Sequence, residues 1–153
     1  MGYLHIENLY KDNTIMLFKE CYALEKIHGT SAHIRWNAQE KKLAFYSGSE
    51  PHEKFLTLFN QQELKEAFAS IFVDSNVMVY GEAYGDKQQG MSRTYGKELK
   101  FIPFDVKVNG MWVNVPNAHN ICEKLNLEFV HYQKIDCTLE AINYEMNLPS
   151  AQA

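Results

Sequence analysis

Apolar and polar residues alternate along several short segments, a spacing of two that predicts β-strands. Five such segments lie at 30–36, 43–47, 77–83, 99–106 and 129–135. The first two flank a polar turn, so we expect them to pair. Asn109-Gly110 is the strongest hairpin signal in the chain, and it predicts that 104–108 and 111–115 pair as a hairpin.

Other segments carry apolar residues every three or four positions, which predicts helices. The segment 61–72 places its apolar residues on one face, and Pro51 suits the first turn of a preceding helix. Two more helices are expected over 116–125 and 138–146. Because strands and helices do not alternate regularly, we expect an α+β fold of antiparallel sheets with packed helices rather than a doubly wound sheet.

Composition indicates one globular domain over residues 1–153. The chain is 46% apolar and 13% aromatic, enough to bury a single core. Its three cysteines, Cys21, Cys122 and Cys137, are odd in number and widely spaced, which predicts free thiols in a reducing compartment rather than disulfides or a zinc site. With no signal peptide and no apolar run of about 18 residues, we expect a soluble cytoplasmic protein without membrane contact.

The net charge of −4 argues against a protein that coats nucleic-acid phosphates generally. Any nucleic-acid contact then depends on a local basic surface, and the alternative for each cation is an ordinary solvated side chain. The candidates are Lys41, Lys42, Lys54, Lys87, Arg93, Lys97 and Lys100.

The most informative short pattern is K-x-x-G at Lys26–Gly29, between an apolar lead-in at 21–24 and the β-prone segment 30–36. This context predicts a strand-loop-strand unit that holds one amine in place. A lysine amine has an unperturbed pKa of about 10.4, and lowering it to about 7 takes roughly 4 to 5 kcal/mol of interaction with desolvating or cationic surroundings. Gly29 lets backbone pass close to a bulky ligand. The alternative is an exposed hairpin lysine followed by a turn glycine.

Three strings along the chain resemble motifs of one enzyme superfamily. Residues 25–30 read E-K-I-H-G-T, residues 77–85 read V-M-V-Y-G-E-A-Y-G, and residues 101–106 read F-I-P-F-D-V. In this order they resemble motifs I, III and IIIa of the covalent nucleotidyltransferases, which include ATP-dependent DNA and RNA ligases and mRNA-capping guanylyltransferases. His28 within the first string is most similar to the double-strand RNA ligase branch, and the resemblance covers most of the chain.

The resemblance implies a nucleotidyltransferase fold and a covalent lysine–AMP intermediate, with ATP and magnesium as cofactors. Lys26 would attack the α-phosphate of ATP. Glu82 would contact the nucleotide ribose or support the catalytic metal, Phe104 would stack on adenine, and Asp105 would support the site through hydrogen bonds. From the residues alone, Glu82 is equally an edge-strand carboxylate facing water, Phe104 a core aromatic, and Asp105 a cap of the adjacent hairpin.

The first string holds further candidates. Glu25 would flank the adenine, and His28 would bind a phosphate or move a proton near neutral pH. Thr30 would offer its hydroxyl to the RNA strand or simply favour the strand that follows. His33 is expected to be structural.

The chain also departs from the family pattern. Tyr46 stands where many of the RNA ligases have a basic residue, and Ser31 replaces an asparagine often found after the threonine. Neither the Glu-Gly that opens motif IV nor the K-x-K pair of motif V occurs in the sequence. The missing lysines would lower the amine's pKa and neutralise the ATP phosphates. We therefore expect a nucleotidyltransferase domain incomplete at its C-terminus, whether truncated, split from a second polypeptide, or degenerate.

These observations predict an ATP-dependent RNA ligase. AMP would pass from Lys26 to an RNA 5'-phosphate, and an RNA 3'-hydroxyl would then displace it. The alternatives are a non-catalytic or split nucleotide- or RNA-binding fragment of such a ligase, a DNA ligase, or a capping enzyme. A second polypeptide supplying motifs IV and V is the partner that the split form would need.

Overall fold

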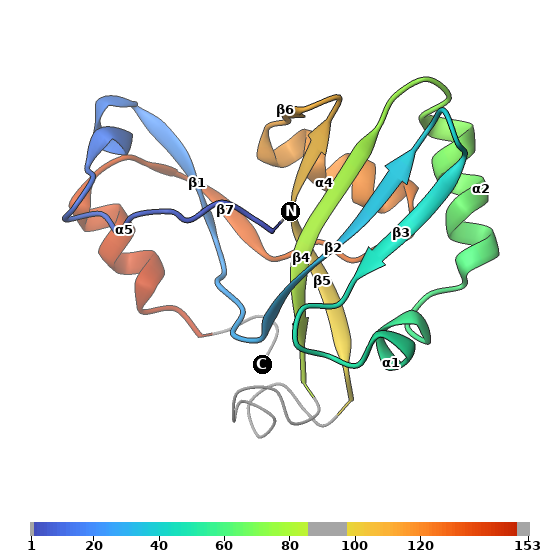
Figure 1. Cartoon of the computed structure of the whole chain (residues 1–153). Coiled ribbons are helices and arrows are strands. Elements are labelled where there is room, and N and C mark those ends of the chain that lie inside the picture. The colour runs from blue at the N-terminus through green and yellow to red at the C-terminus, as the bar shows by residue number, and fades with distance from the viewer. Residues whose placement is uncertain (1, 86–97, 150–153) are drawn as a thin grey trace.

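The computed structural model describes residues 2–85 and 98–149, and its larger part is a five-stranded antiparallel sheet. Along the sheet the order is β3-β2-β4-β5-β6 (Figure 1). The strands are β2 (Thr30–Asn37), β3 (Lys42–Tyr46), β4 (Val77–Tyr84), β5 (Lys100–Val108) and β6 (Met111–Trp112). β4 lies at the centre, and β3 is an edge strand.

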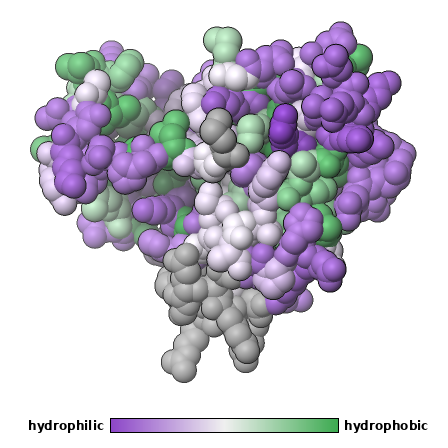
Figure 2. Space-filling view, in the orientation of Figure 1, coloured by the Kyte–Doolittle hydropathy of each residue, from purple (hydrophilic) through white to green (hydrophobic). Residues whose placement is uncertain are grey.

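A smaller lobe stands beside this sheet, on the left in Figure 1. It contains β1 (Glu20–Leu24), which pairs antiparallel with β7 (Tyr132–Asp136), together with α5 (Leu139–Met146) and the 3-10 helix η1 (Thr14–Leu17). Large apolar side chains stay exposed on this lobe, and apolar surface shows there in Figure 2. They include Leu17, Phe18, Leu139 and Met146.

Helices α1 (His52–Leu56), α2 (Gln61–Ile71) and α4 (Val115–Lys124) pack against the larger sheet. Phe68 of α2 stacks on the buried Trp36, with ring centroids 5.8 Å apart, and Phe55 of α1 meets Phe101 edge to face at 5.5 Å. These aromatic contacts place the main core between the helices and the sheet.

Most predicted elements are confirmed, and so is the α+β class with antiparallel sheets. The 30–36 and 43–47 strands pair as expected. Asn109 and Gly110 have φ of 49° and 80°, as a tight hairpin requires. The helix at 61–72 begins after Asn60, whose side chain accepts a hydrogen bond from the Glu63 N–H.

Three predicted boundaries were wrong. The strand expected over 129–135 begins only at Tyr132, because Phe129 and Val130 are buried and Val130 N–H donates to the Pro103 carbonyl instead of joining a ladder. The second strand of the Asn109-Gly110 hairpin spans two residues rather than 111–115, since Asn114 already caps α4. The sequence predicts that the helix opened by Pro51 carries Phe55, Leu58 and Phe59 on one face, but this helix ends at Leu56.

Cys122 and Cys137 are buried and Cys21 is half-buried, and all three are free thiols. In the part of the chain that the structure describes, every helix is too short or too polar to cross a membrane.

Candidate functional site

The loop 25–29 joins the two sheets, because β1 before it belongs to the smaller lobe and β2 after it to the larger sheet. At its first residue, Glu25 N–H donates to the His131 carbonyl at 2.9 Å, which extends the β1–β7 pairing by one step. At its far end, Thr30 lies opposite Ala83 of β4. Each end of the loop is thus held by a different sheet.

Burial alternates within the loop. Ile27 is 6% exposed and belongs to the core, whereas its neighbours Lys26 and His28 are exposed. Both exposed side chains line a hollow of about 570 Å³ between β1, β7 and α5. That volume lies within the usual range for small-ligand sites. The buried Ile27 therefore anchors the loop while the amine and the imidazole face the same space.

Glu82 faces this loop from β4. Its Oε1 accepts a hydrogen bond from Gly29 N–H at 3.3 Å, and its register partner across the sheet is Ser31. Burial raises the pKa of the Glu82 carboxyl, and the Gly29 N–H and the Lys26 charge lower it in part. Lys26 and Gly29, up to 56 residues away in the sequence, thus both interact with the Glu82 carboxyl.

Gly29 is fixed by close packing against β4. A Cβ at this position would lie 3.0 Å from the Ala83 carbonyl carbon and from the Cβ of Tyr84, and closer still to the Ala83 carbonyl oxygen. Its φ is outside the left-handed region, so sterics alone require glycine here. The sequence predicted that Gly29 lets the backbone pass close to a ligand. In the structure it lets the loop pass close to strand β4.

Thr30 holds the neighbouring turn. Its Oγ1 accepts a hydrogen bond from Ser49 N–H at 3.0 Å, and Gly48, with φ of 61°, passes so close that a Cβ there would overlap the Thr30 side chain and the Ser31 carbonyl. The Thr30 hydroxyl keeps its own proton for donation while it accepts this bond. The predicted contact residue therefore also has a structural task.

Phe104 lies at an irregularity of β5. The pairing with β4 shifts between Tyr80 and Gly81, so that Asp105 and Pro103 have partners there and Phe104 has none. Phe104 is half-buried and packs against the core. It lies two residues after Ile102, the register partner of Glu82.

Tyr3 contacts this region from the N-terminal segment, a feature that sequence reasoning missed. Its ring meets Phe104 edge to face at 4.9 Å and also contacts Tyr80 and Trp112. Its hydroxyl donates to Asp105 Oδ2 at 2.6 Å. Burial raises the pKa of the Asp105 carboxyl, while hydrogen bonds from Tyr3 and from Val106 N–H lower it. Nothing in the local sequence around Tyr3 signals this contact, which spans 102 positions.

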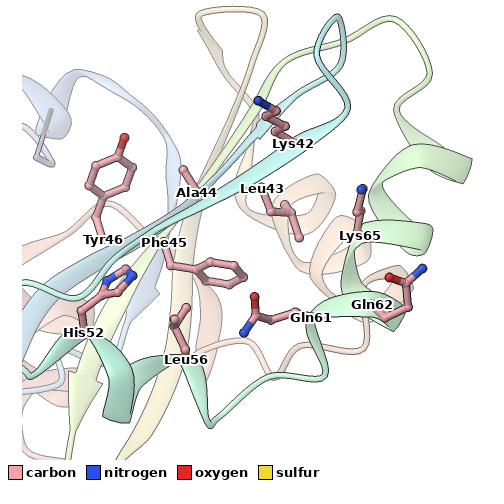
Figure 3. A pocket seen from close by; sticks show the side chains of 10 residues that line it. All are labelled: Lys42, Leu43, Ala44, Phe45, Tyr46, His52, Leu56, Gln61, Gln62 and Lys65. Carbon is pink, nitrogen blue, oxygen red and sulfur yellow. The ribbon is translucent and has the colours of Figure 1, made fainter.

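The predicted basic surface is only partly described. Lys41 lies in the β2–β3 turn with φ of 54°, Lys54 is on α1, and Lys42 lines a hollow at the β3 edge (Figure 3). Lys100 begins β5 and is exposed. Lys87, Arg93 and Lys97, in the loop expected between β4 and β5, lie outside the described residues.

Tyr46 and His33 form a stacked pair near the same edge. Tyr46, at the position where a basic residue is common in the ligases, places its ring 4.3 Å from that of His33 with 20° between the planes. His33 is 5% exposed, consistent with a structural residue. Burial lowers the pKa of its imidazole.

Comparison with solved structures identifies the fold. Solved structures of a Naegleria gruberi RNA ligase mutant with AMP and Mn (TM-score 0.73, 13% identity, 99% of this chain and 49% of that chain) and of an archaeal ATP-dependent RNA ligase (TM-score 0.68, 19% identity, 94% and 40%) share the fold. The chain spans less than half the length of these ligases. No curated protein matches the sequence.

A family model described as RNA ligase matches residues 19–147, which include the loop 25–29, Glu82 and Phe104. The matched range is most of the 153 residues. The chain therefore belongs to the RNA ligase family.

Proposed function

We propose that this protein is an ATP-dependent RNA ligase in which Lys26 forms the covalent AMP intermediate. The observation that carries the proposal is the contact between the K-x-x-G loop and Glu82, made through the Gly29 N–H within a chain of the RNA ligase family. Lys26 faces a hollow large enough for a nucleotide, and Ile27 anchors the backbone behind it.

The reaction proceeds in three transfers. The Lys26 amine, after losing a proton, attacks the α-phosphorus of ATP; a P–N bond forms and pyrophosphate leaves. An RNA 5'-phosphate oxygen then attacks the same phosphorus, and the lysine leaves with its proton restored. Finally an RNA 3'-hydroxyl attacks the activated 5'-phosphate and AMP leaves, so that one phosphodiester forms for each ATP used.

Glu82 and His28 serve the first two transfers in this proposal. The Glu82 carboxylate accepts a hydrogen bond from Gly29 N–H, and in this proposal its remaining acceptor capacity serves a ribose hydroxyl. His28 lines the same hollow as Lys26, which supports a role in binding a phosphate. Phe104 serves the adenine ring, and binding there requires the Tyr3 ring to share or leave its edge contact.

Magnesium fits this residue set only together with the nucleotide. Among the described residues no three His, Cys, Asp or Glu side chains are grouped to hold a metal ion. Magnesium is commonly held by one or two carboxylates plus substrate phosphates, and Glu82 with the ATP phosphates would meet that need. When bound, the ion would neutralise phosphate charge during transfer.

In this proposal a second polypeptide or another segment of the same protein supplies the lysines of motif V, because the 153 residues contain no K-x-K. The solved ligases are about twice as long as this chain, which supports such an addition. The same observation favours the second candidate function, a nucleotide- or RNA-binding fragment that performs no ligation alone.

Labelled ATP tests the proposal. Incubation with magnesium, with and without a supplied motif IV–V segment, is expected to give an acid-labile, alkali-stable adduct that Lys26→Ala abolishes. The sequence holds two other K-x-x-G strings, at Lys87–Gly90 and Lys107–Gly110, so Lys87→Ala and Lys107→Ala are matched controls that keep the adduct. Label retained by the Lys26 variant would refute the assignment, and nucleotide binding without any adduct would favour the second candidate.

A further inference from the structure

Two hollows meet at the open edge of the larger sheet. One, of about 660 Å³, lies between β3 and helices α1 and α2; the other, of about 460 Å³, lies beside Ser31 and the turn after β3. Phe45, Tyr46 and His52 line both, so the two hollows adjoin at these residues. The second one reaches Ser31, the register partner of Glu82. A continuous surface thus runs from α2 to the neighbourhood of the proposed adenylylation site.

The charge along this surface is of one sign. Lys42 of β3 and Lys65 of α2 stand on the rim of the larger hollow, as Figure 3 shows, and no carboxylate lines either hollow among the described residues. Acidic side chains of the same helices, such as Glu53 and Glu66, are not part of the lining. Two lysines on a lining that contains no carboxylate suit a phosphate backbone.

An aromatic ring stands where the two hollows join. One face of the Tyr46 ring is occupied by His33 at 4.3 Å, yet the residue is still 41% exposed. An exposed ring held on one side by a buried partner is a ready platform for a nucleobase, because stacking tolerates any base. Tyr46 would therefore replace the charge of the usual basic residue with a stacking contact.

His33 supplies an independent sign of a ligand. It is 5% exposed and lines the smaller hollow, and its Nε2 is buried with no hydrogen-bond partner among the residues that the structure describes. Buried polar atoms in native proteins are nearly always paired. Burial lowers the pKa of this imidazole, so it is neutral at neutral pH and suits a hydroxyl group better than an anion.

We propose that the joined hollows hold one strand of the RNA substrate beside the adenylylation site, with Lys42 and Lys65 on phosphates, Tyr46 against a base, and His33 Nε2 on a ribose 2'-hydroxyl. The inference rests on the proposed function and adds to it the path of the substrate. It also gives the chain a means to prefer RNA over DNA, because only RNA offers the 2'-hydroxyl.

Binding of a fluorescently labelled single-stranded RNA, followed by anisotropy over a range of salt concentrations, tests the lysines. The double variant Lys42→Ala/Lys65→Ala should reduce the slope of log affinity against log salt by about 1.4, at about 0.7 per lost phosphate contact. The control Lys124→Ala/Lys134→Ala removes the same charge from exposed positions that line neither hollow, and should leave the slope unchanged.

The ring and the imidazole are tested separately. Tyr46→Ala should weaken RNA binding about 5- to 150-fold, whereas Tyr46→Phe, which keeps the ring, should bind as the parent does. His33→Phe keeps an aromatic partner for Tyr46 and removes Nε2, so it should abolish the preference for RNA over DNA of the same sequence. Circular dichroism of each variant confirms that it is folded.

Equal salt slopes in the two double variants, or equal RNA affinity in Tyr46→Ala and the parent, would overturn the inference. Failure of the unaltered protein to bind RNA would also overturn it. Pairing of the β3 edge with an extended peptide, in place of RNA binding, would be one form of that failure. Adenylylation of Lys26, measured on the same preparation with the motif IV–V segment supplied, separates the two proposals: an intact adduct without RNA binding refutes only the substrate path, and loss of both refutes the proposed function.

Discussion

Replacing Gly29 by alanine tests whether packing of the loop against β4 sets the position of the nucleophile. The added Cβ would sit 3.0 Å from two carbon atoms of Ala83 and Tyr84, where carbon atoms prefer about 3.5 to 4.0 Å, and closer to the Ala83 oxygen. Those atoms belong to backbone and to a buried residue of the central strand, so they cannot turn away. The loop has to retreat by about 1 Å.

That retreat should affect stability and chemistry by different amounts. Overpacking of this kind costs about 1 to 3 kcal/mol of unfolding free energy. The hydrogen bond from Gly29 N–H to Glu82, already 3.3 Å long, would lengthen beyond useful range. A displacement of about 1 Å in reacting groups lowers rates by about 10²-fold, so Lys26 adenylylation should fall by that factor in a protein that is still largely folded.

The assay compares Gly29→Ala with Gly110→Ala by thermal unfolding and by the rate of AMP labelling. Gly110 has open space around it but a φ of 80°, so its substitution costs about 1 to 2 kcal/mol through backbone strain alone. Gly110→Ala should therefore lose stability and keep its labelling rate. If the two variants become labelled with AMP at the same rate and have equal stability, the close approach of the loop to β4 does not position Lys26.

Three further outcomes follow from the site. Because burial raises the pKa of Glu82 in the folded state, this carboxyl binds its proton more tightly in the folded protein than in the unfolded chain, where its pKa is about 4.3. The stability that this adds is present below about pH 4.3 and is lost as pH rises through the raised pKa, so Glu82→Gln should flatten that loss in urea titrations at several pH values. Tyr3→Phe removes a hydrogen bond that lowers the pKa of Asp105, so an NMR titration of this carboxyl should give a higher pKa, and an unchanged value would contradict the contact. Phe104→Leu should weaken ATP binding in a folded protein, whereas equal affinity would mean that the ring only packs.

Elements built from local contacts were predictable from the sequence. The hairpin of β2 and β3 and the turn at Asn109-Gly110 depend on neighbouring residues and on the φ values that asparagine and glycine tolerate. The K-x-x-G string, with β-prone residues after it, located the loop that the structure places between two strands. Apolar spacing alone placed the core side chains of α2, including Phe68.

What could not be predicted depends on contacts between distant segments. Nothing in the sequence indicates that β1 pairs with β7, more than 100 positions away, or that the loop therefore joins two sheets. Phe129 and Val130 suggested a strand because they are apolar. A buried residue is apolar whether it belongs to a strand or only packs against the sheet, so the sequence does not distinguish the two cases. The contacts of Tyr3 were missed because its partners Phe104 and Asp105 are about 100 positions away and come near it only in the folded chain.

The position of Lys26 is consequently set by the relation between two sheets. At the start of the loop, Glu25 N–H donates to the carbonyl of His131, the residue before β7. Ile27 anchors the loop in the core, and Gly29 packs against β4 at its end. Each constraint comes from a different part of the fold, so the backbone at Lys26 can shift only if the smaller lobe and the larger sheet move relative to each other. Holding a reacting group from both sides in this way reduces the entropy that must be lost before reaction. The short motif thus specifies the chemistry, while residues more than 50 positions away determine whether that chemistry has a fixed geometry.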